Sequence, residues 1–282
     1  MVKKVRKAVI AVAGFGTRFL PITKTIPKEM LPILNKPIIQ HIVEELSASG
    51  IEEIILVTNW QKKAVEDHFD PSIELEHQLI KQGRSALVAQ MKKISSLAKF
   101  IYIRQIEGYG NALPIITAEN IVGDEPFIYA FGDDLVKSRV PFAKQLIETY
   151  KKYGCSIVGV QKVSSKEVSK YGIVRLRQKT RFLEDIIEKP SQSEAPSNLA
   201  VFGRYLFTPD IFKAMRAVKK GRSDEYWTAD GIRILAKTQP IATQKVRGGR
   251  WLTTGDPISY LNALIEYALD DPKLKKQITF NK

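Results

Sequence analysis

Short apolar runs alternate with segments of helical periodicity through the first half of the chain. Lys7–Ala13 is a continuous apolar run, of the kind that is buried on both faces within a parallel sheet. From Pro37 onward the apolar residues recur at every third or fourth position until Gly50, a residue that commonly ends helices. Ile54–Val57 is the next apolar run. This order predicts a strand, a loop, a helix and a second strand, which is the crossover unit of parallel sheets.

The same alternation continues as far as residue 160. Further strands are expected at Phe100–Ile103, Phe127–Phe131 and Cys155–Val160, and further helices at Gln61–Phe69, Asn111–Ile121 and Val140–Tyr153. Residues 70–99 carry a polar helical pattern and predict an inserted pair of helices outside the sheet. Alternation of this kind predicts an α/β fold with a doubly wound, Rossmann-like sheet that is mixed but mostly parallel.

The pattern changes after about residue 165. Tyr171–Leu176, Phe182–Glu188 and Leu199–Phe207 predict strands, the first two alternating like half-buried antiparallel strands, and Ile258–Leu269 predicts an amphipathic helix. We expect one domain over 1–282. Within it, residues 1–165 form the larger part, residues 166–257 a smaller antiparallel lobe, and residues 258–282 a terminal helix and tail.

Composition places the chain among globular proteins. Of its 282 residues 44% are hydrophobic and 26% charged, which argues against a disordered or fibrous chain. No apolar run approaches about 18 residues, so no membrane span is expected. The apolar stretch Ala8–Ala13 is short for a signal peptide core. Cys155 is the only cysteine, which fits a reducing compartment such as the cytoplasm.

A formal net charge of +14 suggests anionic partners. The basic residues are spread along the chain without a basic tail, and no helix-turn-helix, zinc-finger or RNP-like motif is present. We therefore expect phosphorylated small molecules rather than nucleic acid or a membrane. A solvated basic surface is the alternative interpretation of the same charge.

A glycine-containing loop with two cations follows the first strand. Gly14-Phe-Gly16-Thr17-Arg18 allows the backbone to approach a ligand and to point N–H groups at phosphates. It lacks the third glycine of a dinucleotide fingerprint and the Lys-Ser/Thr of a Walker A loop. Arg18 and Lys28 flank a loop stiffened by prolines, which suits a triphosphate cradle. Alone, these residues also suit a plain turn with two solvated cations.

Carboxylates follow two of the predicted strands. Gly132-Asp133-Asp134 comes directly after Phe127–Phe131, at the end of a strand where α/β sheets bind ligands. Adjacent Asp residues point in different directions, so we expect one of them to reach a metal, and oxygen ligands beside a triphosphate imply Mg²⁺. Glu188-Lys189 ends another strand and offers one sugar-binding carboxylate and one phosphate-binding cation. A turn and a surface ion pair are the structural alternatives.

Taken together and in order, these motifs resemble the signature of nucleotide-sugar pyrophosphorylases. Their residues are most similar to those of the bacterial enzymes that join UTP to glucose 1-phosphate. The resemblance covers roughly residues 7 to 265. The motifs that carry it are Gly14-Phe-Gly16-Thr17-Arg18, Pro27-Lys28-Glu29-Met30-Leu31-Pro32, Arg104-Gln105, Gly108-Tyr-Gly110, Gly132-Asp133-Asp134, Tyr171-Gly172-Ile173, Ile187-Glu188-Lys189-Pro190 and Gly203-Arg204-Tyr205.

The resemblance implies a role for each site residue. The implied nucleotide contacts are Ala13, Gly14, Gly16, Thr17, Glu29, Gln105, Gly110 and Asp133, with Asp133 also holding Mg²⁺. Gln105 and the Ala13–Gly14 backbone would read the pyrimidine edge, and Glu29 would contact the ribose. Gly172, Glu188 and Lys189 would hold the sugar and its phosphate. Arg18, Lys28 and Lys189 would be catalytic, and a homo-oligomer, dimer or tetramer, is implied.

Three positions depart from the family pattern. Thr253 stands where a second metal-binding Asp is usual, with Asp256 as a possible replacement, Asn111 stands where a His is usual, and Trp227 replaces a polar residue. The predicted reaction is attack of a sugar 1-phosphate on the α-phosphate of UTP, giving UDP-glucose and pyrophosphate. Because of Thr253, a non-catalytic regulatory homologue remains an alternative. A second alternative is the same reaction with another sugar 1-phosphate or another nucleoside triphosphate.

Overall fold

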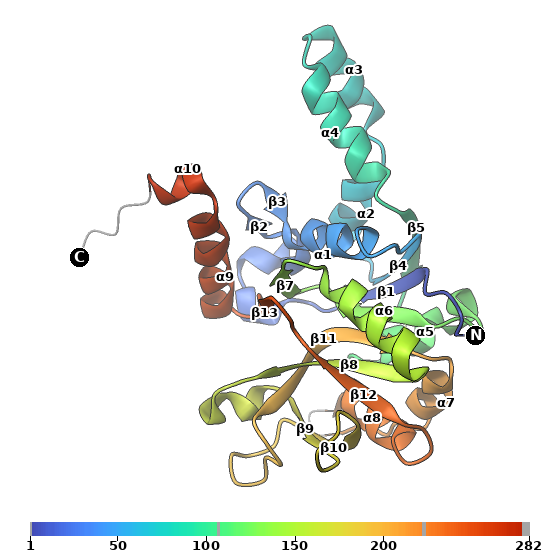
Figure 1. The fold of residues 1–282 in the computed structure, drawn as a ribbon. Helices are drawn as coiled ribbons and strands as arrows, with labels where there is room; N and C mark the ends of the chain where they lie inside the picture. Colours follow the sequence, from blue (N-terminus) through green and yellow to red (C-terminus); the bar gives the residue numbers. More distant parts are fainter. Residues whose placement is uncertain (1, 106–107, 222–223, 278–282) are drawn as a thin grey trace.

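The computed structural model describes residues 2–105, 108–221 and 224–277 and is built on one nine-stranded sheet (Figure 1). The strands of its main path are, in spatial order, β10 (Leu183–Glu188), β9 (Gly172–Leu176), β11 (Leu199–Phe207), β6 (Phe127–Phe131), β1 (Lys7–Ala11), β4 (Glu53–Thr58) and β5 (Lys99–Arg104). Off this path, β8 (Ser156–Lys162) pairs with β11, and β12 (Ile241–Lys245) pairs with β8.

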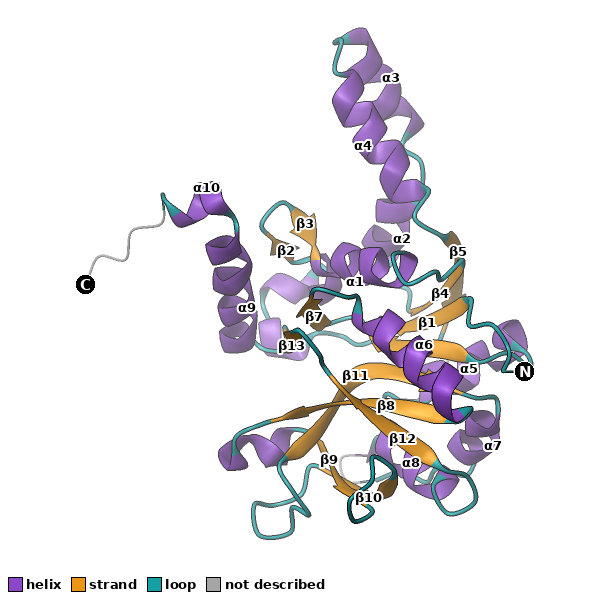
Figure 2. Cartoon of the chain, in the orientation of Figure 1, coloured by secondary structure: helices purple, strands orange, loops and turns teal. Residues whose placement is uncertain are grey.

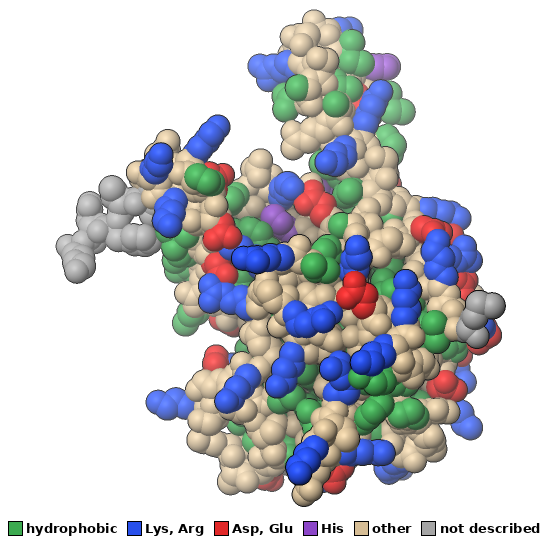
Figure 3. Space-filling model, in the orientation of Figure 1, with side chains coloured by type: hydrophobic (Ala, Val, Ile, Leu, Met, Phe, Trp, Pro, Cys, Tyr) green, Lys and Arg blue, Asp and Glu red, His purple; other side chains and the backbone are tan. Residues whose placement is uncertain are grey.

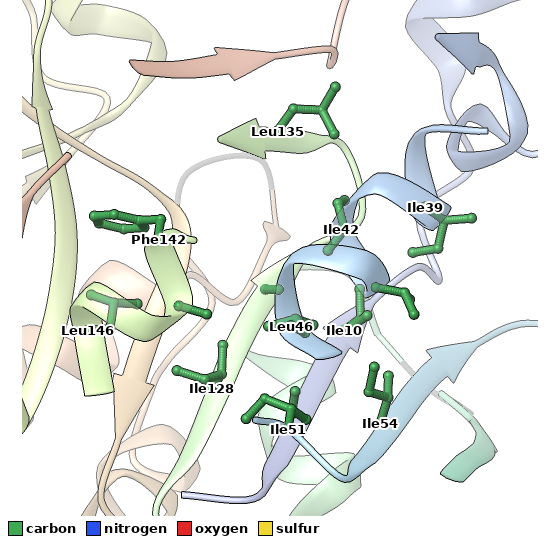
Figure 4. Packing of buried hydrophobic residues seen from close by; sticks show 14 of the residues in the cluster. Ile10, Ile39, Ile42, Leu46, Ile51, Ile54, Ile128, Leu135, Phe142 and Leu146 are labelled. Atoms are coloured by element: carbon green, nitrogen blue, oxygen red, sulfur yellow. The ribbon is translucent and has the colours of Figure 1, made fainter. Parts of the chain in front are cut away.

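The parallel part of the sheet runs from β6 through β1 and β4 to β5. Its central strands are covered on both faces, because Ile10 of β1 belongs to one buried cluster and Val9 to another. Helices α1 (Ile38–Ser47) and α6 (Phe142–Tyr153) pack on the Ile10 side, where Figure 4 shows their residues beside those of β1 and β6. Helix α5 (Leu113–Val122) packs on the other side. This confirms the doubly wound α/β prediction.

The antiparallel part belongs to the same sheet. Strand β11 pairs antiparallel with β6, β8 and β9, and β9 pairs antiparallel with β10. The pairing of β11 with β8 shifts between Val201 and Tyr205, and Gly203 lies inside this irregularity. A Cβ at Gly203 would lie 2.3 Å from the Phe131 ring, so only glycine lets the strands approach this closely. The smaller lobe is therefore a continuation of the parallel layer.

A two-stranded ribbon returns the end of the chain to the parallel part. Strand β13 (Gly249–Thr253) pairs antiparallel with β7 (Asp134–Ser138), directly after β6. The fully buried Arg204 bonds Glu45 of α1 at 2.9 Å and the backbone oxygen of Asp134 at 2.8 Å. These contacts fix the junction of β6 and β7 between α1 and β11.

The remaining helices lie around this sheet. They are α2 (Lys63–Phe69), α3 (Ile73–Lys81), α4 (Ser85–Ser95), α7 (Asp210–Arg216), α8 (Thr228–Leu235), α9 (Pro257–Asp270) and α10 (Pro272–Lys275). As the polar pattern of 70–99 predicted, α3 and α4 form a hairpin that projects from the body (Figures 1 and 2). Strands β2 (Pro32–Ile33) and β3 (Lys36–Pro37) form a short ribbon. No described helix has the length and apolar character needed to cross a membrane.

Candidate functional site

A cavity of about 560 Å³ opens where the parallel strands end. The predicted site residues that line it are Ala13, Gly14, Gly16, Thr17, Arg18, Lys28, Gln105, Gly110 and Asp133. Lining residues that the sequence analysis did not assign to the nucleotide include Asn59, Trp60, Tyr109, Glu225 and Gly255. The loops after β1, β4, β5 and β6 thus meet at the carboxyl edge of the sheet, where open α/β sheets bind ligands.

The glycine loop after β1 is held tightly against Lys28. Gly16 has a φ of 68°, and a Cβ at this position would lie 3.3 Å from the Lys28 Cβ. Thr23 fixes the same turn, because its hydroxyl donates a 2.8 Å hydrogen bond to the Gly16 oxygen. A larger residue at Gly16 would therefore need both a strained backbone and a shift of Lys28.

Lys28 and Asp133 form an ion pair inside the cavity. The Lys28 Nζ lies 2.6 Å from the Asp133 Oδ2, and the two side chains are 20% and 19% exposed. Burial alone would raise the pKa of Asp133, but the charge and hydrogen bond of Lys28, with the charge of Arg18, hold it below its usual value. Burial opposes the charge of Lys28 in turn, and the carboxylates of Asp133 and Glu29 keep its pKa above the usual value. Lys28 and Asp133 are therefore both charged at neutral pH.

The neighbouring Asp134 points away from the cavity. Its carboxylate accepts hydrogen bonds from the Trp251 indole at 2.7 Å and the Gly203 amide at 2.8 Å. Burial, and then the charge of Asp133, raises its pKa to about 6. Trp251 stacks on Phe202 with ring centroids 5.1 Å apart. The pair therefore divides as expected: Asp133 faces the ligand space, and Asp134 braces the ribbon behind it.

The structure does not bring Glu29 to the cavity. Its side chain is fully buried, and Glu29 Oε2 lies 2.8 Å from the Nζ of Lys62, which is also buried. Among the described residues, the other carboxylate oxygen of Glu29 has no hydrogen-bond partner. Lys28 and Glu29 are adjacent on one short 3₁₀ turn, so they point to different sides. This ion pair ties the turn to the start of α2, and the ribose contact of Glu29 stays a prediction.

The predicted base-reading groups also line this cavity. The Gln105 side-chain amide donates to the Gly108 oxygen at 3.1 Å, and the Asn59 amide donates to the Ala13 oxygen at 2.6 Å. Gly110 has a φ of 126°, and a Cβ there would lie 2.1 Å from the Tyr226 backbone oxygen, so glycine is required. The sequence analysis did not predict the exposed Phe15–Tyr109 ring pair, whose centroids lie 5.5 Å apart.

Gly172, Glu188 and Lys189 are grouped together but are absent from the lining of this cavity. A Cβ at Gly172 would lie 2.8 Å from the Val201 Cγ2 and 2.9 Å from the Glu188 Oε2, so a larger residue would crowd Val201 and displace the Glu188 carboxylate. Burial raises the pKa of Glu188 to about 7; the charge of Lys189 opposes the shift, and Asp230 and Glu225 add to it. This carboxyl is therefore close to half-protonated at neutral pH.

Trp227 links this group to the cavity. The Lys189 Nζ lies 5.3 Å from the centroid of the Trp227 ring, within the range of a cation–π interaction. The Trp227 indole donates at 3.1 Å to Glu225, which lines the cavity. Lys189 itself has a φ of 45°, an unusual backbone for a lysine. The indole and this backbone together hold the ammonium beside the nucleotide cavity.

The residues at the three departures from the family pattern all have defined contacts. Asn111 accepts from the Thr228 amide at 2.6 Å, which caps α8. Asp256 is likewise occupied, because it caps α9 by accepting from the amides of Ile258 and Ser259. Both side-chain oxygens are thus engaged in caps, although Asn111 also lines the cavity.

Asp133 and Thr253 lie close to each other beside Gly255, at one wall of the cavity. A Cβ placed on Gly255 would lie 3.3 Å from the Asp133 Oδ2 and 3.4 Å from the Thr253 Oγ1. The described residues contain no cluster of three or more His, Cys, Asp or Glu that could hold a metal ion. One carboxylate and one hydroxyl suit Mg²⁺, which keeps several waters and takes further ligands from substrate phosphates.

Known proteins are similar in sequence to this chain over nearly its whole length. The chain is 43% identical to a UTP–glucose-1-phosphate uridylyltransferase of Bacillus subtilis over 281 residues, covering 99% of the chain and 94% of that relative. It is 43% identical to the corresponding enzyme of Staphylococcus haemolyticus over 279 residues, covering 98% and 96%.

Solved structures of related enzymes have the same fold as this chain, and their sequences are similar to it. A UDP-glucose pyrophosphorylase complexed with UDP-glucose aligns with a TM-score of 0.84 at 40% identity, covering 94% of this chain and 98% of that one. A UTP-bound enzyme from Acinetobacter baumannii aligns with a TM-score of 0.88 at 32% identity, covering 97% of each. The family model for nucleotidyl transferases matches residues 7–269. The chain belongs to the nucleotidyl transferase family.

Proposed function

We propose that the protein makes UDP-glucose and pyrophosphate from UTP and glucose 1-phosphate. The observation that carries this proposal is the cavity in which Arg18, Lys28 and Asp133 meet beneath the glycine loop. The relatives of this chain support the choice of substrates. One is named for this reaction, and two solved structures hold UDP-glucose or UTP.

The chain's own residues hold two anions in line. Arg18 and Lys28 bind the triphosphate, one as a planar fork and the other as a point charge. Lys189 binds the phosphate of the sugar and offsets its repulsion from the nucleotide. An oxygen of the sugar phosphate then forms a bond to the α-phosphorus, and the bond to pyrophosphate breaks on the far side. No covalent intermediate with the enzyme is required, so catalysis rests on positioning and charge neutralisation.

Specificity for the base and the sugar comes from opposite sides of the site. Gln105 can donate to and accept from the imide edge of uracil, with the backbone of Ala13 and Gly14 completing the contact and Gly110 letting the base lie close. The Glu188 carboxylate can accept two hydrogen bonds from sugar hydroxyls, and the Gly172 backbone completes the sugar site. Gly16 and Thr17 provide backbone contacts to phosphate.

The metal ion fits the same arrangement. Asp133 would hold Mg²⁺ that arrives with the nucleotide, and Thr253 could bind one of its waters. When bound, Mg²⁺ supplies positive charge to the phosphates. Because Asp133 is already paired with Lys28, the empty protein should bind Mg²⁺ weakly.

The parts of the chain divide the work unequally. We assign the nucleotide to residues 1–165 and the sugar to residues 166–257, with Glu225 and Gly255 reaching back to the nucleotide cavity. Residues 258–282 add a helix and tail, of which the last five lie outside the described residues. A cytoplasmic homo-oligomer, dimer or tetramer, completes the proposal; the single buried cysteine suits that compartment.

The experiment is pyrophosphate release with Mg²⁺, run across four nucleoside triphosphates and several sugar 1-phosphates. We expect turnover with UTP and glucose 1-phosphate, and little with ATP, since unpaired polar groups at the base edge penalise the wrong base. Equal use of ATP would overturn the role of Gln105. If no pair of substrates reacts, yet Thr253→Asp reacts, the protein is a non-catalytic homologue.

A further inference from the structure

A second groove lies on another face of the molecule. It encloses about 810 Å³ between α6, the turn joining β9 to β10, and β12. Its cationic lining residues are Lys152, Lys179, Arg181, Lys245 and Arg247. Figure 3 shows Lys and Arg side chains gathered over the region of α6 and β12. None of these residues takes part in the proposed reaction.

The positive charge of this groove is largely uncompensated. Glu148 is the one carboxylate in its lining, and it already pairs with Arg247 at 3.3 Å. Among the described residues, Lys152, Lys179 and Arg181 have no carboxylate within 4.0 Å, and the same holds for Lys245. Like charges that converge without counterions destabilise the folded protein, and a bound anion would relieve that repulsion.

Aromatic rings and backbone contacts hold two of these cations in place. The Arg181 guanidinium lies 5.3 Å from the centroid of the Tyr153 ring, and the Lys152 Nζ lies 5.4 Å from it. Phe182 contacts the same ring edge-on, with centroids 5.6 Å apart. The Arg181 backbone oxygen accepts from the Thr243 amide at 2.8 Å and from its hydroxyl at 3.0 Å. The groove is therefore more ordered than a set of free surface lysines.

The turn that carries Lys179 also has an unusual backbone. Lys179 has a φ of 56°, in the left-handed region where a residue with a Cβ is disfavoured. The turn is closed by the Arg177 amide, which donates to the Phe182 oxygen at 2.9 Å, and by the Thr180 amide, which donates to the Arg177 oxygen at 3.1 Å. Local backbone strain of this type often accompanies ligand clamps.

We propose that this groove binds an anion carrying two or more phosphate groups. Four unpaired cations around one cavity match the charge of an oligophosphate better than that of a single carboxylate or monophosphate. A small ligand is favoured over an extended polymer because the cations line one cavity. Its polar floor includes Thr149 and Gln244, whose side chains bond each other at 2.7 Å.

Calorimetric titration with sodium tripolyphosphate, without Mg²⁺ and at constant ionic strength, tests the groove. We expect Lys152→Gln with Arg181→Gln to weaken one class of sites at least about tenfold, as loss of charge-assisted bonds does. The matched control is Arg84→Gln with Lys237→Gln, because both residues are exposed and, in the described chain, without an ion pair. This control should bind like the wild type.

Further variants separate this site from the proposed active site. Arg18→Ala should keep the groove-dependent binding, and loss of that binding in Arg18→Ala alone would overturn the proposal. Unchanged tripolyphosphate binding in the folded groove variant would also overturn it. Should that double variant unfold, the exposed Lys179→Gln is titrated in its place and should weaken the same class of sites.

Two other ligands identify the source of the phosphate groups. Groove-dependent binding of ATP would assign them to a nucleotide, and binding of tripolyphosphate alone would assign a free oligophosphate; either result supports the proposal. If random duplex DNA binds through the groove while tripolyphosphate does not, the ligand is an extended polyanion and the proposal is wrong. A steep loss of DNA affinity with salt would accompany that outcome.

Discussion

The nucleotide side and the sugar side of the site differ in how far they are assembled. On the nucleotide side, Lys28 and Asp133 are paired at 2.6 Å and largely buried. On the proposed sugar side, Lys189 is exposed above the Trp227 ring, and its charge acts on Glu188 against those of Asp230 and Glu225, but among the described residues Glu188 forms no ion pair within 4.0 Å. The charges of the first side are paired before any substrate arrives, whereas in our proposal the charge of Lys189 is paired by the sugar phosphate.

This difference has an energetic meaning. A triphosphate that binds Lys28 must compete with Asp133, and a metal ion that binds Asp133 must compete with Lys28. When both arrive together, each partner of the pair exchanges one charged contact for another, and neither is left buried and alone. The proposed sugar side has no ion pair whose partners must exchange contacts. Single substitutions there should therefore affect the binding of glucose 1-phosphate alone.

The largest effect is expected for Asp133→Asn. The variant removes the metal-binding charge and leaves Lys28 without its partner, so kcat with UTP and glucose 1-phosphate should fall by about 10³-fold or more. Steady-state pyrophosphate release measures it. Thr253→Asp is the matched change, because it adds a carboxylate beside Asp133 and should keep activity. A kcat near the wild-type value in Asp133→Asn would remove this residue from the metal site.

Glu29→Gln tests the other ion pair of the same turn. Because it leaves the buried Lys62 unpaired, we expect a loss of about 3–5 kcal/mol in the free energy of unfolding, measured by urea denaturation. The KM for UTP of the folded protein should change little. Unchanged stability together with a raised KM for UTP would instead restore the ribose contact that the sequence suggested.

Lys189→Ala should separate the two sides of the site. Losing a charge-assisted contact to phosphate should cost about 2–4 kcal/mol, or about 30- to 1000-fold in kcat/KM for glucose 1-phosphate. The Kd for UTP should stay near the wild-type value, since Lys189 is not among the residues that line the nucleotide cavity. Equal losses for both substrates would mean that the two sides are not independent.

Trp227→Gln should loosen Lys189 without removing it. A cation–π contact contributes about 0.5–2 kcal/mol, so the KM for glucose 1-phosphate should rise by about 2- to 30-fold while that for UTP is unchanged. Trp227→Phe keeps an aromatic face and should restore most of the loss. If Phe and Gln behave alike, the ring does not position Lys189.

The smallest effect concerns pH. The pKa of Glu188 is raised to about 7, so folding gains stability from its protonated form below the ordinary carboxyl pKa and loses that gain as the pH rises through about 7. The ionised form accepts hydrogen bonds from sugar hydroxyls, so KM for glucose 1-phosphate should fall between about pH 6 and pH 8. Glu188→Gln should lose this part of the pH dependence; a retained slope belongs to the substrate phosphate.

The sequence predicted the parts of the fold in which burial alone decides the pattern. The run Phe127–Phe131 was predicted as a strand and is one, because a strand covered on both faces must be apolar throughout. Strands β7 and β13 escaped prediction, since they are short and half-exposed. Helix α8 was also missed: Gly231 argues against a helix, yet a Cβ there would lie 2.3 Å from the Met215 sulfur, so packing requires it.

The site residues, too, were predictable only where the local sequence decides their position. Glycines and cations next to one strand, such as Gly16 and Lys28, were predictable because a single loop brings them together. Glu29 was expected at the ligand but does not line the cavity, because a 3₁₀ turn separates the directions of adjacent side chains. Glu225 was not assigned to the cavity, and Gly255 was not predicted there, because their approach depends on pairings between distant segments.

The pairing of β13 with β7 has a consequence for synthesis of the protein. The backbone oxygen of Asp133 accepts from both the amide and the hydroxyl of Thr254, each at 2.8 Å, and Gly255 completes the cavity wall. A ribosome releases the residues of the glycine loop and of β6 long before these. The nascent chain therefore carries every phosphate-binding cation while the wall around Asp133 is still unfinished. Competence for substrate should arise only when Thr254 and Gly255 have emerged and β13 has paired with β7.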